Sequence, residues 1–146
     1  MKVRPAALII ERNHVLLMQY RYGNTDVFNL PGGNPDKGET LPQALERELR
    51  EELGIEVEVG ELVLAGEVIL TQQKNDVLHC VFSTQIIGGI PILNPAETSA
   101  LAVVWKPIST LSGLAMYPNV GAEIQRLMSI GFRTPYVGRI SQVYYE

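Results

Sequence analysis

Apolar residues along this chain recur in short runs, which are typical of β-strands. Two such runs, at residues 6–10 and 15–20, flank the polar segment 11–14 and predict a pair of strands joined by a hairpin turn. Gly60 predicts a break between two later runs. The other runs that predict strands are residues 27–30, 56–59, 62–70, 77–87 and 100–105.

A different spacing predicts a helix at residues 41–53. Leucines recur there every four residues, at positions 41, 45, 49 and 53. At about 100° per residue they cover an arc of roughly 120°, which we expect to face the core. Thr40 and Gln43 have the spacing of a capping box, and Gly54 suits the left-handed residue that ends a helix.

Glutamates of this helix lie beside or within the apolar arc rather than opposite it. With Leu41 at zero on a helical wheel, Glu52 falls at about 20°, Glu48 at about 340° and Glu51 at about 280°. Arg47 falls at about 240°, on the expected solvent side. A helical run of glutamates is usually a solvated face with ion pairs. That interpretation would leave an ionised carboxylate in the apolar sector, so a compensating cation is expected.

A second helix is predicted at residues 119–130, and Gly131 ends it. Strands therefore precede, separate and follow two helices. This order favours an α/β chain of the α+β type, with a mixed sheet and one helix packed on each side. The length favours a single domain over residues 1–146.

The composition narrows the classes of function. Apolar residues make up 46% of the chain and charged residues 19%, as in a soluble globular protein. The net charge of −4 argues against binding of duplex nucleic acid, although it permits a pocket for one nucleotide. Cys80 is the only cysteine, which fits a reducing compartment. Glu11 and Arg12 interrupt the first apolar run, so we expect no signal peptide and no membrane span, and a cytoplasmic protein.

The most specific motif spans residues 33–55 and combines a glycine, a glutamate and the run R-E-aliphatic-x-E-E-x-G-aliphatic. Its fixed positions are Gly33, Glu39, Arg47, Glu48, Leu49, Glu51, Glu52, Gly54 and Ile55. The motif resembles the signature of the Nudix hydrolases at every fixed position. The resemblance implies an α/β/α sandwich. It also implies Mg²⁺- or Mn²⁺-dependent hydrolysis of the pyrophosphate bond in a nucleoside diphosphate linked to another moiety, with water attacking phosphorus.

Glu48 and Glu52, one helical turn apart, are the expected metal ligands, and Glu51 completes the cluster. Carboxylate oxygens are ligands that Mg²⁺ and Mn²⁺ prefer. A backbone carbonyl of Gly32 or Gly33 is a further expected ligand, because glycine lets the chain approach closely.

Arg47 is expected to support these ligands rather than to touch the substrate. It lies four residues before Glu51 and can also reach back to Glu39. The alternative is that Arg47 and Glu51 form an ordinary surface ion pair.

The general base has two candidates. Glu52 is the candidate on the helix, where Glu51 lies next to it, and Glu97 is the candidate on a later polar turn. The alternative for Glu97 is an ordinary turn carboxylate.

Two residues near the signature are candidates for substrate contact. Arg21 has the charge to bind a phosphate, and Phe28 has the ring to stack on a base. The alternatives are a solvated surface arginine and an aromatic residue that fills the core.

The markers of particular substrates are missing. Subgroups that resemble ADP-ribose hydrolases carry a proline where this chain has Leu70 and Thr71, and those that resemble dinucleoside polyphosphate hydrolases carry a tyrosine where it has Gln72 and Gln73. The substrate therefore stays open among nucleoside triphosphates, ADP-ribose, nucleotide sugars and dinucleoside polyphosphates.

The alternative function is a non-catalytic nucleotide-binding or sensing domain. Residues 132–146 are expected to pack either on the sheet of the same chain or on a second subunit, and in the second case the protein would be a homodimer.

Overall fold

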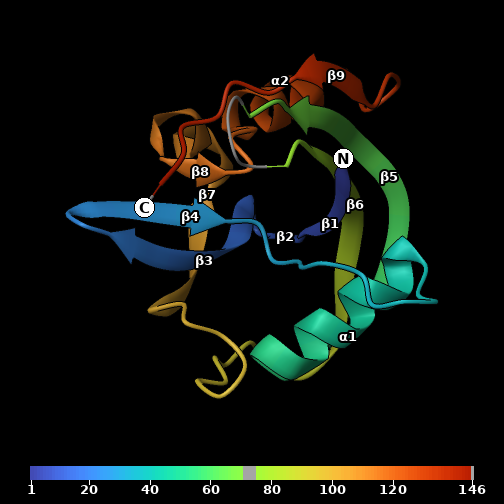
Figure 1. Cartoon of the computed structure of the whole chain (residues 1–146), viewed down its shortest axis with the longest axis vertical. Coiled ribbons are helices and arrows are strands. Elements are labelled where there is room, and N and C mark those ends of the chain that lie inside the picture. The colour runs from blue at the N-terminus through green and yellow to red at the C-terminus, as the bar shows by residue number, and fades with distance from the viewer. Residues whose placement is uncertain (71–74, 146) are drawn as a thin grey trace.

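The computed structural model describes residues 1–70 and 75–145, which form two β-sheets with two α-helices (Figure 1). The first sheet has the order β1-β6-β5-β9, and the second has the order β2-β3-β4-β8 with β7 paired to β3. The strands are β1 (Lys2–Leu8), β2 (Ile10–Glu11), β3 (His14–Tyr22), β4 (Thr25–Asn29), β5 (Glu56–Val68), β6 (Val77–Gly88), β7 (Ala102–Pro107), β8 (Met116–Tyr117) and β9 (Tyr136–Arg139). The helices are α1 (Leu41–Leu53), the 3₁₀ helix η1 (Ile108–Gly113) and α2 (Gly121–Ile130).

The predicted hairpin is present between β2 and β3. Arg12 and Asn13 form its turn with φ of 51° and 60°, a left-handed conformation that asparagine tolerates well. The apolar run 6–10 is divided, however, because β1 ends at Leu8 and β2 starts at Ile10. β1 pairs in parallel with β6 in the other sheet, so this run connects the two sheets.

The predicted signature helix is confirmed as α1, and its ends are those expected. The Thr40 side chain accepts a hydrogen bond from the Gln43 backbone, and the Gln43 side chain accepts one from the Thr40 backbone. Gly54 ends the helix with φ of 66°. Leu45, Leu49 and other apolar side chains of α1 are fully buried.

The predicted break at Gly60 is wrong, since β5 continues through it. The strand passes the glycine by shifting its register against β6 between Val59 and Leu62. A Cβ at Gly60 would lie 3.0 Å from the Ser83 carbonyl oxygen, so glycine lets the two strands stay close. Leu70 lies beyond the end of β5, and positions 71–73 lie outside the described residues.

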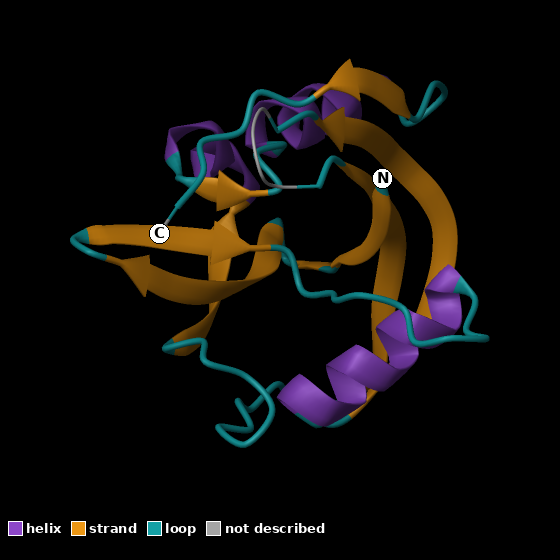
Figure 2. Cartoon of the chain, in the orientation of Figure 1, coloured by secondary structure: helices purple, strands orange, loops and turns teal. Residues whose placement is uncertain are grey.

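The two α-helices lie at opposite ends of the view in Figure 2, and they pack on two separate apolar clusters. One cluster joins α1 to Ala7, Leu16 and neighbouring side chains of the strands. The other joins α2 to Leu64, Val81 and their neighbours. This arrangement confirms the expected mixed sheet structure with a helix on each side. No helix within the described residues has the length and apolar character needed to cross a membrane.

The C-terminal tail packs back onto the first sheet, which is one of the two expectations for it. β9 pairs in parallel with β5, and Ile140 donates a backbone hydrogen bond of 2.7 Å to Glu67. Beyond Ile140 the chain crosses to the second sheet, where the Tyr145 ring stacks with Tyr22 of β3 (Figure 1).

Candidate active site

The glycine loop between β4 and α1 lies directly against the Glu48 carboxylate. A Cβ placed on Gly33 would be 2.6 Å from Glu48 Cδ and less than 3 Å from both of its oxygens. On the other side, the loop contacts β1, where the Ala7 amide donates a 2.8 Å hydrogen bond to the Pro31 carbonyl. The glycines therefore let the backbone fit between β1 and α1, with one carboxylate resting on it.

Arg47 connects the loop to the helix through several carboxylates. Its Nε and Nη2 donate to the two oxygens of Glu39, at 2.8 Å and 2.9 Å. Its Nη1 donates to Glu48 at 2.9 Å and to Glu51 at 3.3 Å. The supporting contacts expected of Arg47 and Glu39 are therefore present, and they raise the pKa of Arg47 above its usual value.

The expected exposure of Arg47 is wrong, because only 21% of its side chain is exposed. Loop residues cover that face of the helix, and the Asn34 carbonyl accepts a 3.2 Å hydrogen bond from Nη2. Asp36 adds a further ion pair at 3.2 Å. A helical wheel alone omits this covering loop, and the alternative of a simple surface pair with Glu51 does not describe the network.

Glu52 is half-buried on the side of α1 that faces β1. Its pKa is raised from the usual 4.5 to about 7, chiefly by burial and next by the neighbouring charge of Glu48. The guanidinium of Arg4 opposes this effect, while Glu51 and Glu97 add to it. Carboxylates therefore converge on Glu52 with little positive charge to balance them.

The turn that carries Glu97 is held against the end of α1. The Asn94 amide donates a 2.9 Å hydrogen bond to the Glu52 carbonyl, and the Asn94 side chain donates one of 3.3 Å to the Glu51 carbonyl. Glu97 itself is exposed, and its charge reaches Glu52. The structure therefore brings the loop candidate and the helix candidate for the general base to the same place.

The carboxylate oxygens of Glu48, Glu51 and Glu52 are of the chemical type that binds a divalent cation. The Glu48 carboxylate packs against Gly33, where a Cβ would displace it. Glu52 is a half-buried carboxyl without a cationic hydrogen-bond partner among the described residues. As the side chains stand, however, residues 1–70 and 75–145 contain no group of three His, Cys, Asp or Glu side chains arranged to hold a metal. Arg47 donates to oxygens of Glu48 and Glu51 instead.

Arg4 also belongs to this site, although no motif in the sequence indicated it. Its Nη1 is buried and has no hydrogen-bond partner within the described part of the chain. Its guanidinium lies 5.3 Å from the centre of the Tyr117 ring, and burial lowers its pKa although Glu52 and Glu48 oppose that shift. The only signal in the sequence is a charged residue just before the apolar run of β1.

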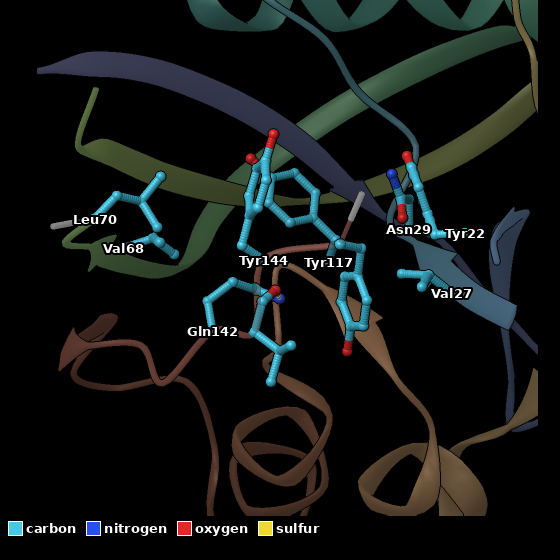
Figure 3. A pocket seen from close by; sticks show the side chains of 10 residues that line it. Tyr22, Val27, Asn29, Val68, Leu70, Tyr117, Gln142 and Tyr144 are labelled. Atoms are coloured by element: carbon cyan, nitrogen blue, oxygen red, sulfur yellow. Dashed lines mark hydrogen bonds between the residues drawn. The ribbon is translucent and has the colours of Figure 1, made fainter. Parts of the chain in front are cut away.

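Two neighbouring cavities lie beside Tyr117, and Arg4 lines one of them. The first has a volume of about 330 Å³ and is lined by Lys2, Arg4, Asn34, Leu70, Asn75, Val77, Tyr117 and Tyr144. The second, also of about 330 Å³, is lined by Tyr22, Val27, Asn29, Val68, Leu70, Tyr117, Gln142, Val143, Tyr144 and Tyr145 (Figure 3). They share Leu70, Tyr117 and Tyr144, so they adjoin.

Arg21 and Phe28, the two candidates for substrate contact, are both engaged by other residues of the fold. Arg21 forms a 2.7 Å ion pair with Asp26 across the exposed β3–β4 hairpin. Phe28 is only 8% exposed and belongs to the apolar cluster on the α2 side, so it corresponds to the core alternative. Its neighbours Val27 and Asn29 line the second cavity instead.

Comparisons with known proteins agree with the signature. The family model described as NUDIX domain matches residues 1–127. The chain is 44% identical over 68 residues to a CTP pyrophosphohydrolase of Escherichia coli K12, covering 44% of this chain and 50% of that protein. It is 34% identical over 83 residues to an ADP-ribose pyrophosphatase of Methanocaldococcus jannaschii, covering 56% and 49% respectively. The chain thus spans about half the length of these curated relatives.

The fold is similar to a solved structure over most of its length. The solution structure of the E. coli ORF135 protein superposes with a TM-score of 0.70 at 25% identity, covering 89% of this chain and 90% of that one.

Proposed function

The chain belongs to the Nudix family, and we propose that it is a metal-dependent pyrophosphohydrolase acting on a nucleotide. The observation that carries the proposal is the convergence of carboxylates on Glu52, whose pKa is raised to about 7. Such a cluster is costly in a folded protein unless a cation joins it.

Glu48 and Glu52 would hold the cation, with Glu51 beside them and the Gly33 backbone as a further oxygen donor. Mg²⁺ or Mn²⁺ there would neutralise phosphate charge and favour ionisation of water. Arg47 holds Glu48 in place through its 2.9 Å hydrogen bond, and Glu39 holds Arg47.

Arg4 and Lys2 are the proposed phosphate contacts of the chain itself. The buried Nη1 of Arg4 lacks an acceptor among the described residues, and a phosphate oxygen would supply one. Lys2 lines the same cavity and adds a second positive charge. Tyr117 lines the same cavity and lies under the Arg4 guanidinium, so phosphates bound at Arg4 would lie beside Tyr117.

We place nucleoside triphosphates first among the substrates, and CTP first among these, because of the similarity to a CTP pyrophosphohydrolase. We place ADP-ribose second, because of the similarity to an ADP-ribose pyrophosphatase. Both names belong to proteins that this chain matches over about half their length.

The test is turnover of CTP, ADP-ribose, a nucleotide sugar and a dinucleoside polyphosphate with Mg²⁺, with Mn²⁺ and with chelator. We expect cleavage that requires metal and falls at least 100-fold in Glu48→Gln and Glu52→Gln. Glu46→Gln, on the same helix but outside the Arg47 network, is the matched control and should retain activity. Binding of these compounds without cleavage by the wild-type protein would instead support the sensing alternative.

A further inference from the structure

The second of the two cavities, which we call the tyrosine cavity, has walls from both ends of the chain. Tyr22, Val27 and Asn29 come from the β3–β4 hairpin, whereas residues 142–145 come from the C-terminal tail. Figure 3 shows Asn29 and Tyr22 on one side, Leu70 and Val68 on the other, and Tyr117 and Tyr144 between them.

Two sets of aromatic contacts lie between the tyrosine cavity and the carboxylates. Tyr20 lies near Glu52, and its ring stacks with Tyr22 at 6.5 Å, which in turn stacks with Tyr145 at 6.1 Å. On the other route, the Arg4 guanidinium lies over Tyr117, which lines the cavity. A molecule with its phosphates at Arg4 can therefore extend its other end into this cavity.

The tail segment 141–145 is anchored in place. The Asn119 side chain donates a 2.9 Å hydrogen bond to the Ser141 carbonyl, and the Asn119 amide donates one of 2.8 Å to the Gln142 side chain. Gln142 in turn donates to the Met116 carbonyl at 3.0 Å. This segment lies beyond the part of the chain that the NUDIX domain model matches, residues 1–127.

The lining of the tyrosine cavity suits a flat, weakly polar ring. Tyrosine rings supply stacking surfaces, and Val143 and Tyr144, which also line the cavity, are 62% and 51% exposed. Asn29 adds an amide whose Oδ1 is buried and without a partner within the described residues. An amide of this kind can pair with the donor and acceptor groups on the edge of a base.

We propose that the tyrosine cavity binds the base of the nucleotide and that the tail segment 141–145 is a specificity-determining wall of it. This inference rests on the proposed function for the position of the phosphates. The volume of about 330 Å³ lies at the lower end of the range for ligand pockets, roughly 300–1,000 Å³, and is sufficient for a single base.

The test compares binding of CMP, AMP and ribose 5-phosphate to the full chain by calorimetry, which requires no cleavage. We expect at least one of the two nucleotides to bind about tenfold or more tightly than ribose 5-phosphate. Tyr22→Ala and Tyr145→Ala should each reduce that preference by about fivefold or more, and Asn29→Ala should change the ratio between CMP and AMP.

Tyr136→Ala is the matched control, because Tyr136 lies on the same tail but contacts Glu67 rather than the cavity. It should leave all three affinities unchanged. Equal binding of ribose 5-phosphate and both nucleotides, or no binding of either nucleotide, would overturn the proposal. An unchanged preference in both tyrosine variants, with melting temperatures like the wild type, would also overturn it. A protein that cleaves nothing yet shows the expected preference would refute the proposed function and retain this one.

Discussion

Glu52 shows how one side chain links stability to function. Its carboxyl lies in the apolar sector of α1, and its pKa is raised to about 7 because burial and Glu48 disfavour the charged form. A group of this kind destabilises the metal-free protein at neutral pH.

The first prediction concerns the stability of the metal-free protein. Between pH 4.5 and about 7 the folded state binds more protons at Glu52 than the unfolded state, so stability should fall as pH rises through this window. Glu52→Gln should remove that loss and be more stable at pH 8, by on the order of 2 kcal/mol once the shift is discounted for the partial exposure of the carboxyl to solvent. Urea unfolding in chelator at pH 5 and pH 8 measures this, and a less stable Glu52→Gln protein at pH 8 would contradict it.

The second prediction concerns Gly33. A Cβ there would be 2.6 Å from Glu48 Cδ, so Gly33→Ala should displace that carboxylate and lower kcat by about 10- to 100-fold. Gly113→Ala is the control, because a Cβ there meets nothing within 4 Å. Turnover and melting temperature should be measured together. Wild-type activity in Gly33→Ala would show that the close packing of loop and carboxylate is not required.

At the scale of elements, α1 and the preceding loop act as one unit held by Arg47. The arginine contacts Glu39 on the loop and Glu48 and Glu51 on the helix. By contrast, Arg50 makes an exposed pair with Glu56. Arg47 therefore lies in a partly enclosed network of carboxylates, whereas Arg50 forms a single pair in solvent.

The third prediction compares these two arginines. Arg47→Ala leaves partly enclosed carboxylates unpaired, so it should cost about 1–3 kcal/mol of stability and also lower activity. Arg50→Ala should change stability by less than about 1 kcal/mol and leave activity intact. Arg47→Lys should recover only part of the loss, since lysine cannot reproduce the paired contacts to Glu39. Similar effects of Arg47→Ala and Arg50→Ala in unfolding and turnover assays would refute a special role for Arg47.

The turn that carries Glu97 is a second element fixed by α1, through the hydrogen bonds of Asn94. The fourth prediction separates the two candidates for the general base. If Glu97 accepts the proton of water, Glu97→Gln should lower kcat by about 100-fold, leave KM nearly unchanged and remove the acidic limb of the pH profile. If Glu52 does so, Glu97→Gln should keep the limb and lose less than about tenfold. Steady-state kinetics from pH 5 to 9 decide between them.

At the scale of the molecule, the site assembles at the junction of the two sheets. β1 supplies Arg4, α1 supplies the carboxylates, and the β3–β4 hairpin and the C-terminal tail supply the tyrosine cavity. The parallel pairing of β1 with β6 and the Gly32 contact with Ala6 place these parts together. Under the proposed function, the carboxylates would act at phosphorus, and the residues at the junction would contact the rest of the substrate.

The fifth prediction concerns Arg4. Arg4→Met should raise KM for a nucleoside triphosphate by about tenfold or more and affect a substrate with fewer phosphates less. Arg126→Met, on the exposed face of α2, is the control and should leave KM unchanged. An unaltered KM in Arg4→Met would remove Arg4 from the phosphate site.

The sequence by itself determined α1, its capping box and its glycine end, because these depend on contacts between residues three or four apart. It also identified Glu48 and Glu52 as carboxylates at the edge of the buried face. Tertiary structure alone decided that a loop covers Arg47, that the run 6–10 divides between sheets and that Phe28 is core rather than cavity. It also brought Arg4 and the tail segment 141–145 to the site. These outcomes depend on strand pairing between distant parts of the chain, which a local pattern does not encode.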